Sequence, residues 1–220
     1  MRTCEFRDLG RLGYAEGLAL QRHFSEARKQ GSVPDQLLIV EHPPVLTLGR
    51  NAHLENLLAG PELLRRRGVE VHETNRGGDI TYHGPGQVVG YPILDLREWK
   101  RDVVAYVRGL EDVLIGSLAS FGLHAGRVAG ATGVWVEDRK IAAIGVHISR
   151  WVTSHGFALN VTTDLSYFKL IVPCGLTKPV TSLEAEGVSA SRAEVVAALA
   201  REFERVFEVE ITEAERERVS

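Results

Sequence analysis

Residues 76–96 read RGGDITYHGPGQVVGYPILDL, and this stretch is the most unusual part of the chain. With Asn75 included, five glycines or prolines fall within the thirteen residues up to Gln87. Glycines let a backbone pass close to a ligand, while arginine and histidine side chains supply hydrogen-bond donors. The alternative interpretation is a tight turn between two strands. The segment is not a phosphate loop, because it contains neither GxxxxGK[ST] nor a GxGxxG that opens a helix. It predicts a loop that contacts a ligand, followed by a strand from Gln87 to Leu96.

The elements on either side of this segment predict an α+β fold. An apolar stripe indicates a helix from Tyr14 to Lys29 that ends before Gly31, and a second helix spans 103–121. Ser191 with Glu194 forms the capping box of a last helix. Further strands are expected at 3–7, 36–41, 45–48, 69–73, 133–137, 141–148 and 156–161, with a turn at 138–139. Because the strands are grouped between a few helices, we expect one domain over 1–220 with a mixed, mainly antiparallel sheet and flanking helices.

Composition excludes several classes of protein. The formal net charge of −3 argues against a general nucleic-acid binder, which usually has a strongly basic face. Arg65, Arg66 and Arg67 form the one basic run, at the end of an expected helix where positive charge suits the helix dipole. No stretch approaches the roughly 20 apolar residues of a membrane span, and the N-terminus shows no secretory signal. We therefore expect a cytoplasmic protein without a membrane partner, in which both cysteines are reduced.

Cys174 lies between Pro173 and Gly175, just after an apolar run. This position could project the thiol from a fixed backbone into a cleft. A lone cysteine is more often a buried packing residue, because only a lowered pKa or a nearby base makes a thiol reactive. Cys4 has no comparable context and is assigned to packing.

Lys140 stands at the start of the strand that runs through small and apolar residues to 148. A lysine in a hairpin turn is by default solvated. If Lys140 lies beside a thiol instead, its positive charge stabilises the thiolate. Partial burial then lowers the pKa of its own amine towards the range that is useful for a general base.

Together these segments resemble the lipoyl(octanoyl) transferase family, whose fold is that of the biotin and lipoate protein ligases. The similar stretches are HPPVLTLGR (42–50), the glycine-rich stretch 76–96, GVWVEDRKIAAIGVHISRWVTSHGFALNV (133–161) and FKLIVPCGL (168–176). The resemblance implies that Cys174 is the nucleophile that forms an acyl-thioester. It also implies that Lys140 lowers the pKa of that thiol and assists proton transfer. The residues that the family uses to line the acyl pocket correspond to Arg76, Gly77, Gly78, Asp79, Ile80, Thr81, Tyr82, His83, Ala143, Ile144, Gly145, Gly156, Phe157 and Ala158.

The resemblance also implies the partners. The donor would be octanoyl-acyl carrier protein, and the acceptors would be lipoyl domains of 2-oxoacid dehydrogenases and the glycine cleavage H protein. Neither a cofactor nor a metal is expected. Three alternatives remain: an ATP-dependent lipoate or biotin protein ligase, an acyl-binding protein without activity, and a cysteine hydrolase that uses His83 as base.

Overall fold

The computed structural model describes residues 2–172 and 178–214. Their largest element is an eight-stranded sheet, in which the two pairs formed by β1 are parallel and the other five are antiparallel. In spatial order its strands are β11 (Val209–Glu213), β1 (Arg2–Arg11), β2 (Asp35–Glu41), β6 (Gln87–Ile93), β10 (Val152–Asn160), β9 (Arg139–Ser149), β8 (Ala131–Val136) and β7 (Gly126–Val128). The predicted mixed, mainly antiparallel α+β fold is confirmed.

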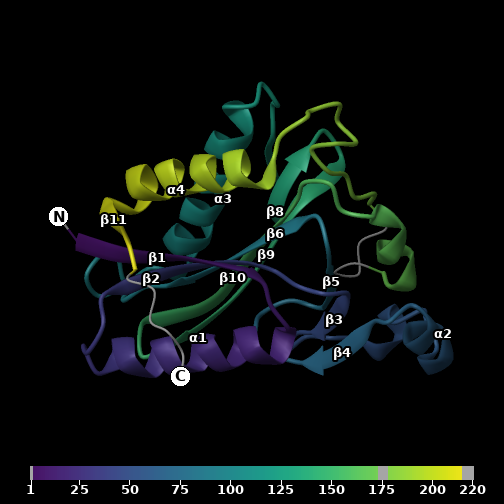
Figure 1. Ribbon diagram of the computed structural model, residues 1–220, viewed down its shortest axis with the longest axis horizontal. Coiled ribbons are helices and arrows are strands. Elements are labelled where there is room, and N and C mark those ends of the chain that lie inside the picture. Colours follow the sequence, from purple (N-terminus) through teal and green to yellow (C-terminus); the bar gives the residue numbers. More distant parts are fainter. Residues whose placement is uncertain (1, 173–177, 215–220) are drawn as a thin grey trace.

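Helices cover both faces of this sheet (Figure 1). Helix α1 (Tyr14–Lys29) lies on one face, and α3 (Val103–Ala119) and α4 (Arg192–Phe207) pack together on the other. Side chains of β2 alternate between the two layers: Leu37 and Ile39 join the core beneath α3 and α4, while Leu38 and Val40 join the cluster beneath α1. Because strand side chains point to opposite faces in turn, the apolar run of β2 supplies both cores.

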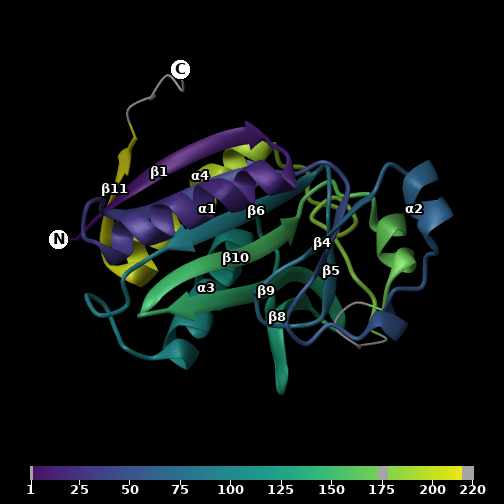
Figure 2. The ribbon, with the colours of Figure 1, turned by 90° about the horizontal axis from the view of Figure 1, so that it is seen from below.

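A second, three-stranded sheet lies at one end of the molecule (Figure 2). It consists of β4 (Glu70–Glu73), β3 (Val45–Leu48) and β5 (Ile80–His83), in that order. The helices α2 (Pro61–Arg66), η1 (Leu54–Asn56) and η2 (Leu165–Leu170) belong to the same region, which has its own core around Leu46, Ile80 and Tyr82. The name small-sheet region is used below for these six elements. Within residues 2–172 and 178–214, no helix is both long and apolar enough to cross a membrane.

Several predicted limits match the structure, including those of β3, whereas α3 ends at 119 and not at 121. Helix α1 has the predicted bounds, and the Ser191 hydroxyl accepts from the Glu194 N–H at the start of α4. The turn between β8 and β9 falls at 137–138, one residue earlier than expected. The sequence analysis missed β5, β7 and β11, and β5 lies inside the predicted loop. Strand β5 forms because it pairs with β3, which is more than thirty residues away in the chain.

A buried ionic network joins α1 to the main sheet. Arg28 Nε donates to Asp35 Oδ1 at 2.8 Å, and its Nη2 lies 2.7 Å from Glu98. The same Asp35 carboxylate accepts from the backbone N–H of Asp95 at 2.9 Å. Burial raises the pKa of Asp35, and hydrogen bonds from Arg28 and Asp95 oppose that rise. The network keeps each buried charge paired, as burial requires.

We expect Arg28→Met to destabilise the fold by about 3–5 kcal/mol, because it leaves the Asp35 carboxylate buried with its main cation removed. Arg150→Met is the matched control. Arg150 pairs with Glu26 at 3.2 Å on the surface, so its loss should cost no more than about 1 kcal/mol. Urea unfolding of both variants measures the difference. Equal unfolding midpoints would contradict a stabilising role for the Arg28 network.

Candidate active site

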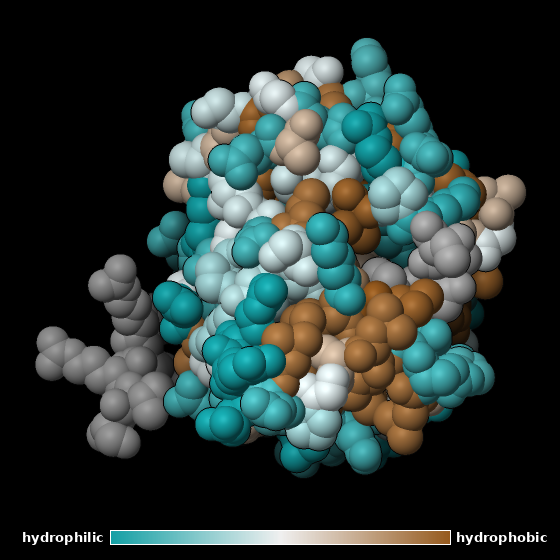
Figure 3. Space-filling view, turned by 90° about the vertical axis from the view of Figure 1, so that its right-hand side faces the viewer, coloured by the Kyte–Doolittle hydropathy of each residue, from teal (hydrophilic) through white to brown (hydrophobic). Residues whose placement is uncertain are grey.

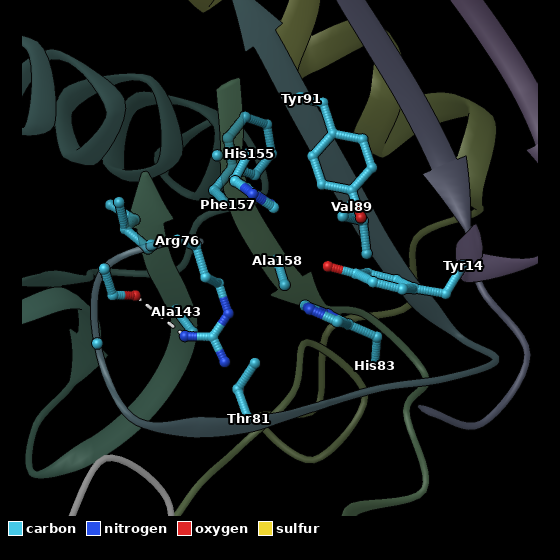
Figure 4. A pocket seen from close by; sticks show the side chains of 15 residues that line it. Tyr14, Arg76, Thr81, His83, Val89, Tyr91, Ala143, His155, Phe157 and Ala158 are labelled. Carbon is cyan, nitrogen blue, oxygen red and sulfur yellow. Dashed lines mark hydrogen bonds between the residues drawn. The ribbon is translucent and has the colours of Figure 1, made fainter. Parts of the chain in front are cut away.

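A cavity lies between the glycine-rich segment and the main sheet (Figure 4). Most of its lining is apolar or small, with a few polar groups. The lining residues are Tyr14, Arg76, Gly77, Gly78, Thr81, His83, Val89, Tyr91, Ala143, Ile144, Gly145, His155, Gly156, Phe157 and Ala158.

Strand β5 divides the glycine-rich segment between two roles. Thr81 and His83 line the cavity, whereas Ile80 and Tyr82 belong to the core of the small-sheet region. The Tyr82 ring stacks on Tyr167 with 4.9 Å between centroids. Successive side chains of a strand point to opposite faces. Ile80 and Tyr82, which the family resemblance assigned to the acyl pocket, therefore do not line this cavity.

Asp79 is the third predicted pocket residue that does not line the cavity. Its carboxylate accepts from the backbone N–H groups of His53 at 2.9 Å and Ile80 at 2.8 Å, and from Asn56 Nδ2 at 2.5 Å. It therefore ties the glycine-rich segment to the start of η1. Asp79 therefore stabilises the conformation of the loop without lining the cavity.

Arg76 lines the cavity, and its buried guanidinium is held by polar atoms of the protein. Its Nε donates to Thr47 Oγ1 at 3.1 Å and its Nη2 to the Thr47 carbonyl at 2.5 Å. Nη1 donates to the Gly77 carbonyl at 3.0 Å, the bond drawn in Figure 4. These bonds attach the loop to β3 and fix the direction of the guanidinium.

Glycines on three neighbouring strands allow the loop to lie on the sheet. Gly156 of β10 pairs with Gly145 of β9, and a Cβ on Gly156 would overlap the Gly90 carbonyl of β6. A Cβ on Gly145 would lie 3.0 Å from the Gly77 carbonyl of the loop. The Gly77 N–H donates to the Val146 carbonyl at 2.9 Å, which holds the loop at this distance. The close approach of the loop to β9 therefore depends on the absence of a side chain at Gly145.

Tyr91 and His155 lie at the opposite end of the cavity from Thr81 and Ala143 (Figure 4). The Tyr91 hydroxyl lies 2.7 Å from Nε2 of the buried His42, and His42 Nδ1 lies 2.8 Å from the Leu12 carbonyl. A carbonyl only accepts, so Nδ1 carries the proton and Nε2 accepts from Tyr91. The ring of Tyr91 is thereby fixed as an end wall.

The sequence analysis did not nominate four of the lining residues, Tyr14, Val89, Tyr91 and His155. Two of them could have been found from the alternation of side chains along β6. Val89 and Tyr91 are two residues apart, so they lie on the same face of the strand. No local pattern marks Tyr14, which belongs to α1, or His155. His155 has a positive φ of 55°, which is uncommon for a residue other than glycine.

Burial sets the charge of the histidines around the cavity. It lowers the pKa of His83 to about 3, with a further contribution from His42. Burial also lowers the pKa of His155 to about 3, with a contribution from Arg76. Both rings are therefore neutral near pH 7, so the cavity presents weakly polar rings to a ligand.

Lys140 lies beside the end of the cavity that is formed by Thr81 and Ala143, opposite Tyr91. Its backbone N–H donates to the Pro179 carbonyl, and its carbonyl accepts from the Thr181 N–H, both at 2.9 Å. Its Nζ lies 4.9 Å from the centroid of the Trp135 ring. The side chain lines a hollow that shares Thr81, Ala143 and Ala158 with the cavity. A group bound in the cavity can therefore extend towards Lys140.

Cys174 lies outside the described residues, whereas Cys4 is fully buried in the main core, as its assignment to packing requires. In the described part of the chain, no group of three or more histidine, cysteine, aspartate or glutamate side chains is arranged to hold a metal ion.

The low pKa of His83 predicts a pH-dependent stability. Between pH 6.5 and about 3 the unfolded chain binds a proton on this residue that the folded chain does not, so the free energy of unfolding falls as pH falls. In His83→Gln, this fall should be weaker by up to about 1.4 kcal/mol per pH unit. Urea unfolding between pH 7.5 and 4.5 measures it, with the exposed His124→Gln as control. Parallel pH profiles for His83→Gln and the wild type would contradict the prediction.

Comparison with known proteins places this chain in a family. Residues 13–204 match the family described as the lipoyl protein ligase A/B catalytic domain. An octanoyltransferase of Solibacter usitatus is 64% identical over 211 residues, which cover 96% of each chain. An octanoyltransferase of Acidobacterium capsulatum is 57% identical, over 90% of this chain and 88% of that protein.

Solved structures show the same fold at lower sequence identity. A putative lipoate protein ligase from Thermoplasma acidophilum with bound lipoic acid superposes with a TM-score of 0.80 at 18% identity, covering 99% of this chain and 91% of the other. A lipoate-protein ligase A bound with ATP gives a TM-score of 0.79, also at 18% identity, over 99% of this chain and 90% of the other. The chain therefore belongs to the lipoyl protein ligase A/B catalytic domain family, in which its similarity to octanoyltransferases makes it an acyltransferase.

Proposed function

We propose that this acyltransferase moves an octanoyl group from octanoyl-acyl carrier protein to a lysine of a lipoyl domain, through a thioester on Cys174. The structural observation that carries the proposal is the position of Lys140 at one end of a largely apolar cavity. The relatives that are 57–64% identical and are named octanoyltransferase support the choice of acyl group.

The first step exchanges one thioester for another. The Cys174 thiolate attacks the carbonyl carbon of the donor thioester, and the bond to the carrier sulfur breaks. The protonated Lys140 amine stabilises the attacking thiolate and then gives its proton to the departing carrier sulfur. The products are an octanoyl thioester on Cys174, a carrier thiol and a neutral Lys140. The reaction exchanges bonds of the same type and needs no ATP.

The second step converts the thioester into an amide. The amine of the acceptor lysine attacks the carbonyl carbon, and Lys140, left neutral by the first step, accepts the proton that this nitrogen loses. Cleavage of the carbon–sulfur bond releases the Cys174 thiolate next to the protonated Lys140, which restores the starting pair. One lysine side chain therefore balances the protons of both steps.

The cavity supplies the binding energy for the tail. Ala143, Ile144, Phe157 and Ala158 provide apolar surface along β9 and β10, and each buried methylene contributes about 0.8 kcal/mol. With the carbonyl carbon near Lys140, the ω-methyl end of the tail points to Tyr91. The distance between these two residues then sets the preferred chain length.

The acceptors proposed are lipoyl domains of 2-oxoacid dehydrogenases and the glycine cleavage H protein. The cytoplasmic location and the absence of a cofactor stay predictions. The ligase alternative shares the fold and differs in chemistry, because a ligase activates a free acid with ATP. The experiment below separates the two reactions.

Mixing the enzyme with octanoyl-acyl carrier protein in the absence of ATP should add one octanoyl group to the protein, as measured by intact-protein mass spectrometry. Hydroxylamine should remove the added group, because it cleaves thioesters. Cys174→Ser should show no hydroxylamine-sensitive adduct, while Cys4→Ser should behave as the wild type because Cys4 lies in the core. In the same assay, Lys140→Ala should form the adduct slowly.

Two results would overturn the proposal. Acyl transfer that requires ATP and free octanoate would identify a ligase. Normal transfer by Cys174→Ser would remove the thioester from the reaction.

Tyr91→Ala should shift the chain-length preference towards longer acyl groups. Removing the ring opens the end of the cavity, and two further buried methylenes can then favour a decanoyl donor by up to roughly tenfold in kcat/KM relative to octanoyl. Tyr91→Phe is the control, since it retains the ring and loses only the hydrogen bond to His42. Unchanged relative kcat/KM values for the two donors in Tyr91→Ala would contradict the assignment of Tyr91 as the end wall.

A further inference from the structure

An exposed apolar surface lies on the small-sheet region. Leu54 of η1 and Leu58, two residues after η1, are 68% and 59% exposed, in contrast to Leu64 of α2, which is buried. Figure 3 shows hydrophobic side chains gathered on the side of the molecule that carries α2 and η2. Exposed apolar patches of this kind are typical of protein–protein contact sites.

The same region carries three consecutive arginines, Arg65 to Arg67. Arg65 and Arg66 are exposed on the last turn of α2, and in the described part of the chain neither forms an ion pair. Arg67 follows them and lies over the Tyr167 ring, 5.5 Å from its centroid. The three consecutive arginines outnumber the acidic residues of η1 and α2, which are Glu55 and Glu62, on a chain whose net charge is −3. The name leucine–arginine surface is used below for Leu54, Leu58, Arg65 and Arg66.

This surface is separated from Lys140 by the width of η2. The backbone N–H of Leu58 donates to the Leu170 carbonyl at 2.9 Å, at the end of η2. Phe168 of the same helix lines the hollow that contains the Lys140 side chain. A protein bound over Leu58 therefore lies beside the end of the cavity where the acyl carbonyl is exchanged in the proposed reaction.

We propose that the leucine–arginine surface docks the donor carrier protein, through an acidic helix that places apolar side chains on Leu54 and Leu58 and carboxylates on Arg65 and Arg66. The inference rests on the proposed function and adds to it the place where the donor binds. Charge complementarity across such a contact mainly raises the association rate, and the apolar contact slows dissociation.

The donor and the acceptor differ in how far the reacting group lies from the body of the protein. A carrier protein holds its thioester at the end of a long flexible prosthetic arm, so its body can dock across η2 while the acyl group enters the cavity. The acceptor presents its amine on a lysine side chain and must bring its own backbone close to the thioester. A surface displaced from Lys140 by one helix is therefore suited to the donor.

The test compares two donors with the double variant Arg65→Glu/Arg66→Glu: octanoyl-acyl carrier protein, and octanoyl-pantetheine, which has the thioester and no protein. For the carrier donor, kcat/KM should fall at least about tenfold, and its decrease with added salt should become weaker. For octanoyl-pantetheine, kcat/KM should stay within about twofold. Arg201→Glu, on an exposed position of α4, is the matched control and should leave both donors unaffected.

Leu58→Ser provides an independent variant, which should raise KM for the carrier donor only. Equal losses for both donors, or no loss for either, would overturn the docking assignment while leaving the proposed function intact. A raised KM for the lipoyl domain with an unchanged KM for the carrier would overturn it in favour of the acceptor. Failure of the wild type to use either donor would instead refute the proposed function.

Discussion

The close approach of the glycine-rich segment to the main sheet is the constraint on which the site depends. Gly90, Gly156 and Gly145 lie on three adjacent strands, and the backbone of Gly77 packs against the last of them. A side chain at Gly145 would push the loop away, and one at Gly156 would separate β10 from β6. Without this row, the loop and the sheet could not enclose a cavity between them, and the residues of the loop would have no surface to face.

Strand β5 then decides what each residue of the loop does. Pairing with β3 turns Thr81 and His83 towards the cavity and places Ile80 and Tyr82 in the second core. Asp79 and Arg76 hold the two sides of the loop, one through η1 and the other through Thr47. The same short segment thus builds the wall of the site and attaches that wall to a stable core.

Three properties of the proposed reaction are assigned to neighbouring elements. The tail is assigned to the space over β9 and β10, proton transfer to Lys140 at the start of β9, and donor docking to the small-sheet region beyond η2. Burial keeps His83 and His155 neutral, so an uncharged acyl tail meets no charged imidazole in the cavity. Among the described residues that line the cavity, Arg76 is the one cation, and its donors bond to Thr47 and Gly77.

The features that are encoded locally could be predicted from the sequence. The apolar stripe and Gly31 gave the limits of α1, the Ser191–Glu194 box gave the start of α4, and grouping of the strands gave the α+β class. The segments around Arg76, Ala143 and Gly156 were also identified, and most of their residues line the cavity. The folded structure was needed to establish that β5 is a strand and that Asp79, Ile80 and Tyr82 do not line the cavity. It was also needed to add Tyr14, Tyr91 and His155 to the lining. The physical reason is that these properties depend on contacts between residues far apart in the chain, such as Leu46 with Tyr82 and Tyr91 with His42, which no local pattern records.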